Sequence, residues 1–207
     1  MTSPLNRFYQ TRAANVRLQE ISKAAVEERT TAVRHKCFLS YHSVDAEEVL
    51  SFVEAYSSVF IPKAIGISED DPYIESDNVD YVLQRIRDMY LADSTVTIVL
   101  VGACTWARKY IDWEVYSTLR RDPNNRLSGL MAIELPSISD GGGKLPDRVK
   151  LNVSGKNSDE GYARYWKYPS SASSLKGLIQ DAHDARTDRD DLIDLGGPRK
   201  TRNSSCP

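Results

Sequence analysis

The stretch from residue 96 to residue 119 constrains the fold of this chain more than any other segment. It opens with six apolar or β-branched residues, 96–101, a run typical of a strand that is buried on both faces of a sheet. Gly102 interrupts the run, and a segment with helical spacing follows it. A buried parallel strand, a short turn and a helix form the unit that holds ligands at the carboxyl edge of open α/β sheets. We therefore expect a ligand site where this strand ends.

One carboxylate, Glu114, takes an unusual position on the helix predicted after this strand. At the angular spacing of an α-helix, Glu114 lies at the margin of an apolar face and an aromatic face, and no Lys or Arg lies three or four residues away to pair with it. This position suits a carboxylate that takes part in chemistry better than one that only aids solubility. The apolar face collects Ile111, Val115, Thr118 and Leu119, and the aromatic face collects Trp106, Tyr110, Trp113 and Ser117.

Strands and helices alternate along the rest of the chain. Such alternation with short connections predicts an α/β fold with a doubly wound parallel sheet of five strands, for which we expect the flavodoxin-like order 2-1-3-4-5. Asp45 is expected to cap the first helix after the first strand, and Pro62 to end that helix. Asp77 is expected to cap the next helix. The expected strands are 37–41, 64–68, 96–101, 127–135 and 162–168, and a last helix is expected over 175–185.

Three parts follow from composition. Residues 1–34 form a helical extension, residues 35–185 the domain, and residues 186–207 a tail. The extension carries only a thin apolar stripe, so we expect it to pack on the domain, with a partner or oligomer helix as the alternative. From Arg186 onward the residues are charged or are Gly, Pro, Asn and Ser, which predicts a disordered tail.

Charge and cysteine usage exclude several classes of function. The formal net charge of −2 gives no electrostatic footprint for nucleic acid or an anionic membrane. Cys37, Cys104 and Cys206 match neither a disulfide framework nor a zinc site, a pattern that fits a reducing compartment and no metal. The first residues lack the apolar core of a signal peptide, and no apolar run approaches the ~18 residues of a membrane span. We expect a cytoplasmic protein.

The predicted strand order brings the loop after the first strand beside the loop after the third. The first loop lacks the Gly and Thr that cradle a flavin phosphate, and the third strand does not end in the aspartate of a phosphoryl receiver. Neither a Walker loop nor a G-x-G-x-x-G motif occurs. Cys104 could approach His42 as a thiol nucleophile, although a free cysteine is more often a small buried residue.

Two blocks of sequence resemble the Toll/interleukin-1 receptor (TIR)-like proteins of bacteria and archaea. FLSYHSVDAEEV, residues 38–49, resembles the first strand and loop of that family. STVTIVLVGACTWARKYIDWEV, residues 94–115, resembles its third strand and following helix. The likeness is greatest to the TIR-like proteins of the Thoeris antiphage system, and it covers about residues 36–121.

The resemblance implies chemistry on NAD as a substrate, with no bound cofactor. In active TIR domains a helix glutamate, matched here by Glu114, lies by the nicotinamide ribose, and the glycosidic bond breaks to release nicotinamide. Thoeris-type members join the ADP-ribose part to itself, which gives a cyclic signal that activates an effector protein. A carboxylate suits this reaction because it stabilises an oxocarbenium-like state. The residues expected to bind NAD are Tyr41, His42, Ser43, Gly102, Thr105, Trp106, Tyr110 and Trp113.

Two further expectations come from the same resemblance. The acidic loop 69–76 would mediate self-association, as the corresponding loop does in the family. Many TIR domains are interaction scaffolds without turnover, and a non-catalytic scaffold is therefore the alternative function. The site residues also have purely structural alternatives: Trp106, Tyr110 and Trp113 could be a packed helix face, and His42 could only hydrogen-bond its own loop.

Overall fold

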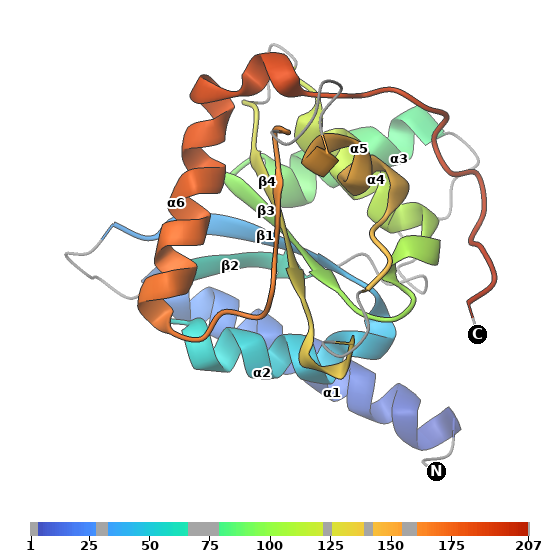
Figure 1. Ribbon diagram of the computed structural model, residues 1–207. Helices are drawn as coiled ribbons and strands as arrows, with labels where there is room; N and C mark the ends of the chain where they lie inside the picture. Colours follow the sequence, from blue (N-terminus) through green and yellow to red (C-terminus); the bar gives the residue numbers. More distant parts are fainter. Residues whose placement is uncertain are drawn as a thin grey trace.

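The computed structural model describes residues 4–27, 33–65, 79–121, 126–138, 143–154 and 161–206. Within these ranges five parallel strands form one sheet in the order β2-β1-β3-β4-β5 (Figure 1). The α/β fold class and the flavodoxin-like strand order predicted from the sequence are confirmed. The strands are β1 His35–Tyr41, β2 Phe60–Ile65, β3 Val96–Val101, β4 Gly129–Glu134 and β5 Arg164–Trp166.

Helices follow the strands along the chain. A π-helical turn, Arg87–Leu91, extends α3, and the 3-10 turns η1, Ser43–Asp45, and η3, Thr105–Ala107, follow β1 and β3. The helix α5 was not predicted from the sequence. The helices are α1 Pro4–Glu27, α2 Ala46–Tyr56, α3 Val79–Ile86, α4 Lys109–Leu119, α5 Asp147–Ser154 and α6 Ala172–Asp188.

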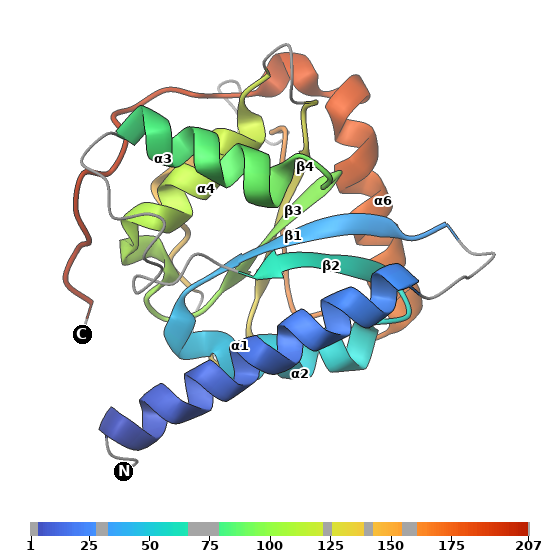
Figure 2. The same ribbon diagram turned by 180° about the vertical axis from the view of Figure 1, so that it is seen from behind.

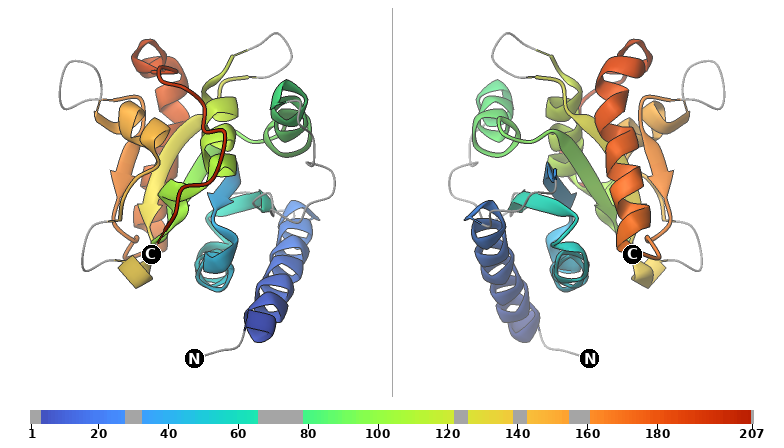
Figure 3. Two further views of the ribbon diagram at one scale, coloured as in Figure 1. Left: turned by 90° about the vertical axis from the view of Figure 1, so that its right-hand side faces the viewer. Right: turned by 90° about the vertical axis from the view of Figure 1, so that its left-hand side faces the viewer.

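The sheet lies between two layers of helices (Figure 3). Alternate residues of a strand point to opposite faces, and on β3 Ile98 and Leu100 pack with α1, α2 and α6 while Val99 and Val101 pack with α4. Every residue of β3 is buried, as its continuous apolar run predicts for a central strand. Gly129 at the start of β4 leaves room for the backbone of α6 at Ala182.

The structure differs from the sequence prediction between α2 and β2. The helix that Pro62 was predicted to end already stops at Tyr56, and β2 begins at Phe60 rather than at residue 64. Pro62 therefore lies inside a strand instead of ending a helix. Proline is tolerated there because β2 is the edge of the sheet and pairs only with β1.

The N-terminal helix packs on the domain. α1 lies beside α2 and the edge strand β2 (Figure 2). The side chain of Leu18 is fully buried, and the Ser22 hydroxyl donates a hydrogen bond of 2.5 Å to the carbonyl of Pro62. The Tyr41 hydroxyl donates to Oδ1 of Asn15 at 2.8 Å. Of the two alternatives from the sequence, the structure shows the packed extension.

The C-terminal tail is not disordered, which corrects the sequence prediction. Residues 193–206, named here the C-terminal strap, run over α5 and α4 (Figure 1). Arg148 on α5 is 2% exposed and donates to the carbonyls of Leu195 and Gly196 at 3.1 and 3.2 Å. Asn152, also buried, donates to the carbonyl of Asp194 and accepts from its amide, both at 2.9 Å. The composition of these residues did not predict their order, because these contacts are made by the backbone groups of the strap.

A disulfide joins Cys104 to Cys206, 102 residues apart, with their Cα atoms at 5.7 Å. This finding corrects two expectations, that the cysteines form no disulfide and that Cys104 could be a nucleophile. Cys37 on β1 is free, and its complete burial raises the pKa of its thiol. Spacing could not reveal the pair because only the path of the strap brings the two cysteines together.

Removal of the strap is expected to destabilise the protein. A variant that ends at Leu192 removes the strap partners of Arg148 and Asn152, at about 1–3 kcal/mol for each buried group that loses one, while the contacts of Arg148 with Asp112 and of Asn152 with the Arg148 carbonyl remain. Since 1 kcal/mol shifts the Tm of a protein of this size by about 2–4 °C, calorimetry should show a Tm lower by ~5 °C or more. Full-length Cys206→Ser keeps the contacts at residues 194–196 and should lose less. A truncated protein that melts with the wild type would contradict this account of the strap.

Candidate functional site

The loops after β1 and β3 meet at the carboxyl edge of the sheet, as the strand order predicts. Tyr41, the last residue of β1, pairs with Leu100 of β3. Beyond this pair, the carboxyl group of Asp45 occupies the space that a side chain on Gly102 would need. The Gly102 amide donates to Oγ1 of Thr105 at 2.9 Å, which closes the turn into η3. A residue larger than glycine at position 102 would therefore displace the Asp45 side chain.

Glu114 lies beneath this edge, between α4 and the sheet. Its side chain is 1% exposed, and the hydroxyl of Ser40 on β1 donates to its Oε2 at 2.5 Å. Ser40 is fully buried. Burial and, secondarily, the charge of Glu114 raise the pKa of Tyr41. The sequence placed Glu114 at the margin of two helix faces but could not show Ser40 as its partner, because Ser40 belongs to another element 74 residues away.

Asp45 supplies a second carboxyl group at the edge. Burial and, secondarily, the charge of Glu48 raise the pKa of Asp45 to about 6, against the opposing effect of a hydrogen bond with Thr105. Its Oδ2 atom is buried without a hydrogen-bond partner among the described residues. Asp45 precedes α2 as predicted, but its side chain makes no capping hydrogen bond. Its place in the loop after β1 is the only sequence signal of this environment.

The predicted site residues of the first loop are partly engaged within that loop. Nδ1 of His42 accepts a hydrogen bond of 3.1 Å from the amide of Val44, and the ring therefore caps η1. Ser43 is the first residue of η1 and is half-buried. The loop is thus held in shape at the entrance to the edge.

The three aromatic residues predicted on the segment after β3 lie in different surroundings. Trp113 is 5% exposed, packs in the cluster that includes Phe38 and Leu83, and donates from Nε1 to the carbonyl of Lys200 in the strap at 2.8 Å. Tyr110 meets the Trp113 ring edge to face, with 5.4 Å between ring centroids. Trp106 in η3 is half-buried, and Nζ of Lys144 lies 3.5 Å from its ring centroid. Trp113 is therefore part of the core, whereas Trp106 is nearer the surface.

Comparison with known families agrees with this architecture. Residues 38–140 match the family model described as Thoeris protein ThsB, TIR-like domain. This chain belongs to the Thoeris ThsB TIR-like family. The matched region holds the second half of β1, all of β3 and α4, and the whole carboxyl edge described above, while α1, α6 and the strap lie outside it. No curated protein matches the chain.

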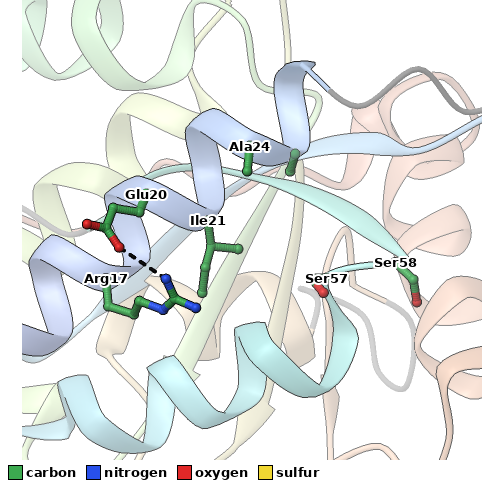
Figure 4. Close-up of a pocket in the computed structure, with 7 residues that line it drawn as sticks. Arg17, Glu20, Ile21, Ala24, Ser57 and Ser58 are labelled. Atoms are coloured by element: carbon green, nitrogen blue, oxygen red, sulfur yellow. Dashed lines mark hydrogen bonds and ion pairs between the residues drawn. The ribbon is translucent and has the colours of Figure 1, made fainter.

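A cavity of about 540 Å³ lies between α1 and the turn after α2, away from the carboxyl edge of the sheet (Figure 4). Its charged residues compensate one another, since Arg17 pairs with Glu20 at 3.1 Å. None of the residues expected to bind NAD lines it. The lining residues are Arg17, Glu20, Ile21, Ala24, Ala25, Ser57 and Ser58.

Membranes, metals and the acidic loop complete the description. Within the described ranges, no helix combines the length and apolarity that crossing a membrane requires. In the same ranges, His, Cys, Asp and Glu side chains form no group that could hold a metal ion. The predicted self-association loop, 69–76, and the predicted cap Asp77 lie outside the described residues.

The raised pKa of Asp45 predicts a pH dependence of stability. Between pH 3.8 and about 6 Asp45 is protonated to a larger fraction in the folded protein than in the unfolded chain, so its contribution to the free energy of unfolding should fall as pH rises through this window. Asp45→Asn removes the cost of the buried charge and should stabilise the protein at pH 7 by roughly 1–3 kcal/mol relative to the wild type. Urea denaturation at several pH values measures both effects.

Asp93→Asn is the matched control for this measurement. A hydrogen bond from Lys63, together with the charges of Lys63 and Lys36, lowers the pKa of Asp93, so its contribution to the pH dependence has the opposite sign. A wild-type stability that rises relative to Asp45→Asn between pH 4 and pH 7 would contradict the assigned environment of Asp45.

Proposed function

We propose that this TIR-like domain cleaves the nicotinamide–ribose bond of NAD, with Glu114 as the catalytic carboxylate, and forms a cyclic ADP-ribose-type signal in antiphage defence. Membership of the Thoeris ThsB family supports the defence role. The observation that carries the reaction is the buried pair of Glu114 and Ser40 beneath the carboxyl edge of β1 and β3. This edge is where open α/β sheets bind ligands.

The chemistry of NAD cleavage matches what a buried carboxylate offers. As the bond to the nicotinamide nitrogen breaks, the bonding electrons leave with nicotinamide and positive charge develops on the ribose. A negative charge fixed in a site with little water stabilises that state far more than the same charge does in bulk water. Capture of the ribose by a nucleophile within the same molecule gives a cyclic product and one proton, whereas capture by water gives ADP-ribose and one proton.

Ser40 and Asp45 have supporting roles in this proposal. The hydrogen bond from Ser40 fixes the direction of the Glu114 carboxylate. Asp45, whose burial raises its pKa to about 6, is suited to accept the proton that the attacking hydroxyl or nitrogen releases at neutral pH. Because Glu114 is only 1% exposed, NAD reaches it after a movement at the edge that uncovers the carboxylate.

Partners follow from the same proposal. The cyclic product would activate an effector protein, and self-association through the loop 69–76 would precede turnover. A non-catalytic scaffold is the competing function. A scaffold would bind its partner without ever releasing nicotinamide, so turnover decides between the two.

Replacement of the catalytic carboxylate tests the proposal. Glu114→Gln keeps the size of the side chain and the contact with Ser40 but removes the charge, so nicotinamide release should fall by about 10²-fold or more while the protein stays folded. Chromatography of NAD and nicotinamide measures the rate, and circular dichroism checks the fold.

Glu134→Gln provides the matched control. Glu134 is 6% exposed and ends β4, opposite Val101, so it is a buried carboxylate at the same edge of the sheet. We expect this variant to retain turnover. Wild-type rates in Glu114→Gln would exclude Glu114 as the catalyst, and equal losses in both variants would show that any buried charge at the edge matters.

A second pair of variants tests the positioning role of Ser40. Ser40→Ala removes one hydrogen bond to a charged group, a contribution of about 1.5–3 kcal/mol, so kcat should fall roughly 10- to 100-fold with little change in KM. Thr97→Val is the control, because Thr97 and Thr118 form an equally buried hydroxyl pair, at 2.9 Å, between β3 and α4 without touching the Glu114 carboxylate. A similar loss of kcat in both variants would indicate general loosening of α4 instead of positioning.

A further inference from the structure

The strap is hydrogen-bonded to α4, the helix that carries Glu114. The amide of Lys200 donates to Oδ2 of Asp112 at 2.9 Å, and the carbonyl of Lys200 accepts from Nε1 of Trp113 at 2.8 Å. The amide and the carbonyl of Lys200 thus bind the side chains of Asp112 and Trp113, the two residues that precede Glu114. Asp112 is further held by the buried Arg148 of α5 at 3.1 Å. Strap, α4 and α5 form one connected polar network.

The strap also completes the first turn of α4. Arg108, the residue that precedes α4, makes no side-chain capping hydrogen bond, although the first amides of a helix need acceptors. Oδ1 of Asn203 accepts from the amide of Lys109 at 2.9 Å, and the amide of Ser204 donates to the carbonyl of Ala107 at 2.8 Å. The cap of α4 therefore comes from a segment 94 residues along the chain.

The end of the strap is tied to the carboxyl edge by a covalent bond. Cys206 is bonded to Cys104, which stands between Gly102 and Thr105, two residues expected to bind NAD. Both cysteines are only half-buried, so a small thiol can approach them. Between Lys200 and Cys206 the exposed residues Thr201, Arg202 and Ser205 add little packing.

The backbone of the strap bends at Gly197. Its φ of +80° is a conformation that side chains rarely adopt, and Pro198 follows it. On one side of Gly197 the buried Arg148 and Asn152 hold residues 194–196. On the other side, the disulfide and a few hydrogen bonds hold residues 200–206.

We propose that the Cys104–Cys206 disulfide is a thiol–disulfide exchange site that locks residues 200–206 over the first turn of α4. A dithiol reductant supplies the two electrons and two protons. Its thiolate attacks one sulfur of the disulfide, which forms a mixed disulfide and releases the other cysteine as a thiol. The second thiol of the reductant then attacks the mixed disulfide and releases the remaining cysteine. The products are the Cys104 and Cys206 thiols and the oxidised reductant. Without the disulfide, residues 200–206 are a chain end with few contacts and should fray, because the bond no longer keeps them at high effective concentration near their partners on α4.

Release of the strap removes the external cap of α4 and the contact over Trp113, beside the covered Glu114. Reduction should therefore open the carboxyl edge to NAD, a consequence that rests on the proposed function. The redox-dependent release of residues 200–206 does not rest on the proposed function, because this release concerns only the disulfide and the hydrogen bonds of the strap.

The test compares full-length wild type, oxidised with diamide or reduced with dithiothreitol, and full-length Cys206→Ser under both conditions. Thiol counting in denaturant verifies the bond: one free thiol, that of the buried Cys37, before reduction and three after it. Hydrogen exchange at the amides of Lys109, Lys200 and Ser204 reports docking and should become about tenfold faster on reduction. In Cys206→Ser the same amides should exchange fast both with and without dithiothreitol. Nicotinamide release is followed in the same samples and should rise severalfold with reduction.

The outcomes separate this proposal from the proposed function. Failure of oxidation to join Cys104 and Cys206, or equal amide exchange in both redox forms, overturns the switch whatever the turnover. Faster exchange with no turnover in any sample supports the switch and overturns the proposed NAD chemistry. Faster exchange with turnover that does not respond to reduction overturns the gating of the site by the strap.

Discussion

The hydrogen bond from Ser40 to Glu114 is the interaction on which the arrangement of the site depends. It joins the carboxyl end of β1 to α4 through two side chains that are almost completely buried. A buried carboxylate that loses a hydrogen bond is destabilised, so this bond favours the observed position of α4 against the sheet. The Thr97–Thr118 pair holds the same helix to β3. Together the two pairs set the height and rotation of α4.

The opposite side of α4 is held by the C-terminal part of the chain. Asp112 binds Arg148 of α5 and the backbone of the strap, so a helix of the family-matched region depends on residues beyond that region. This dependence gives residues 193–206 a structural role in spite of their polar composition. It also connects the redox state of a disulfide to the helix that carries the proposed catalytic residue.

The sequence predicted those features that repeat along the chain and missed those that join distant segments. The bounds of β3 and the order of the sheet follow from a continuous apolar run and from alternating periodicities. Pro62 misled the prediction because an edge strand accepts the residue that ends a helix. α5 was missed because its buried side chains include Arg148 and Asn152, which bind a strap backbone that no local pattern reveals. Glu114 stood out by its position, whereas Ser40, Asp45 and the disulfide needed the folded chain.

The most direct measurement is mass spectrometry of NAD incubated with the reduced wild-type protein over a range of protein concentrations. The account predicts that NAD disappears, that nicotinamide appears in equal amount, and that the second product lacks one water relative to ADP-ribose, as a cyclic product must. Intact NAD at every protein concentration would contradict the central claim that Glu114 serves catalysis, and would favour a scaffold.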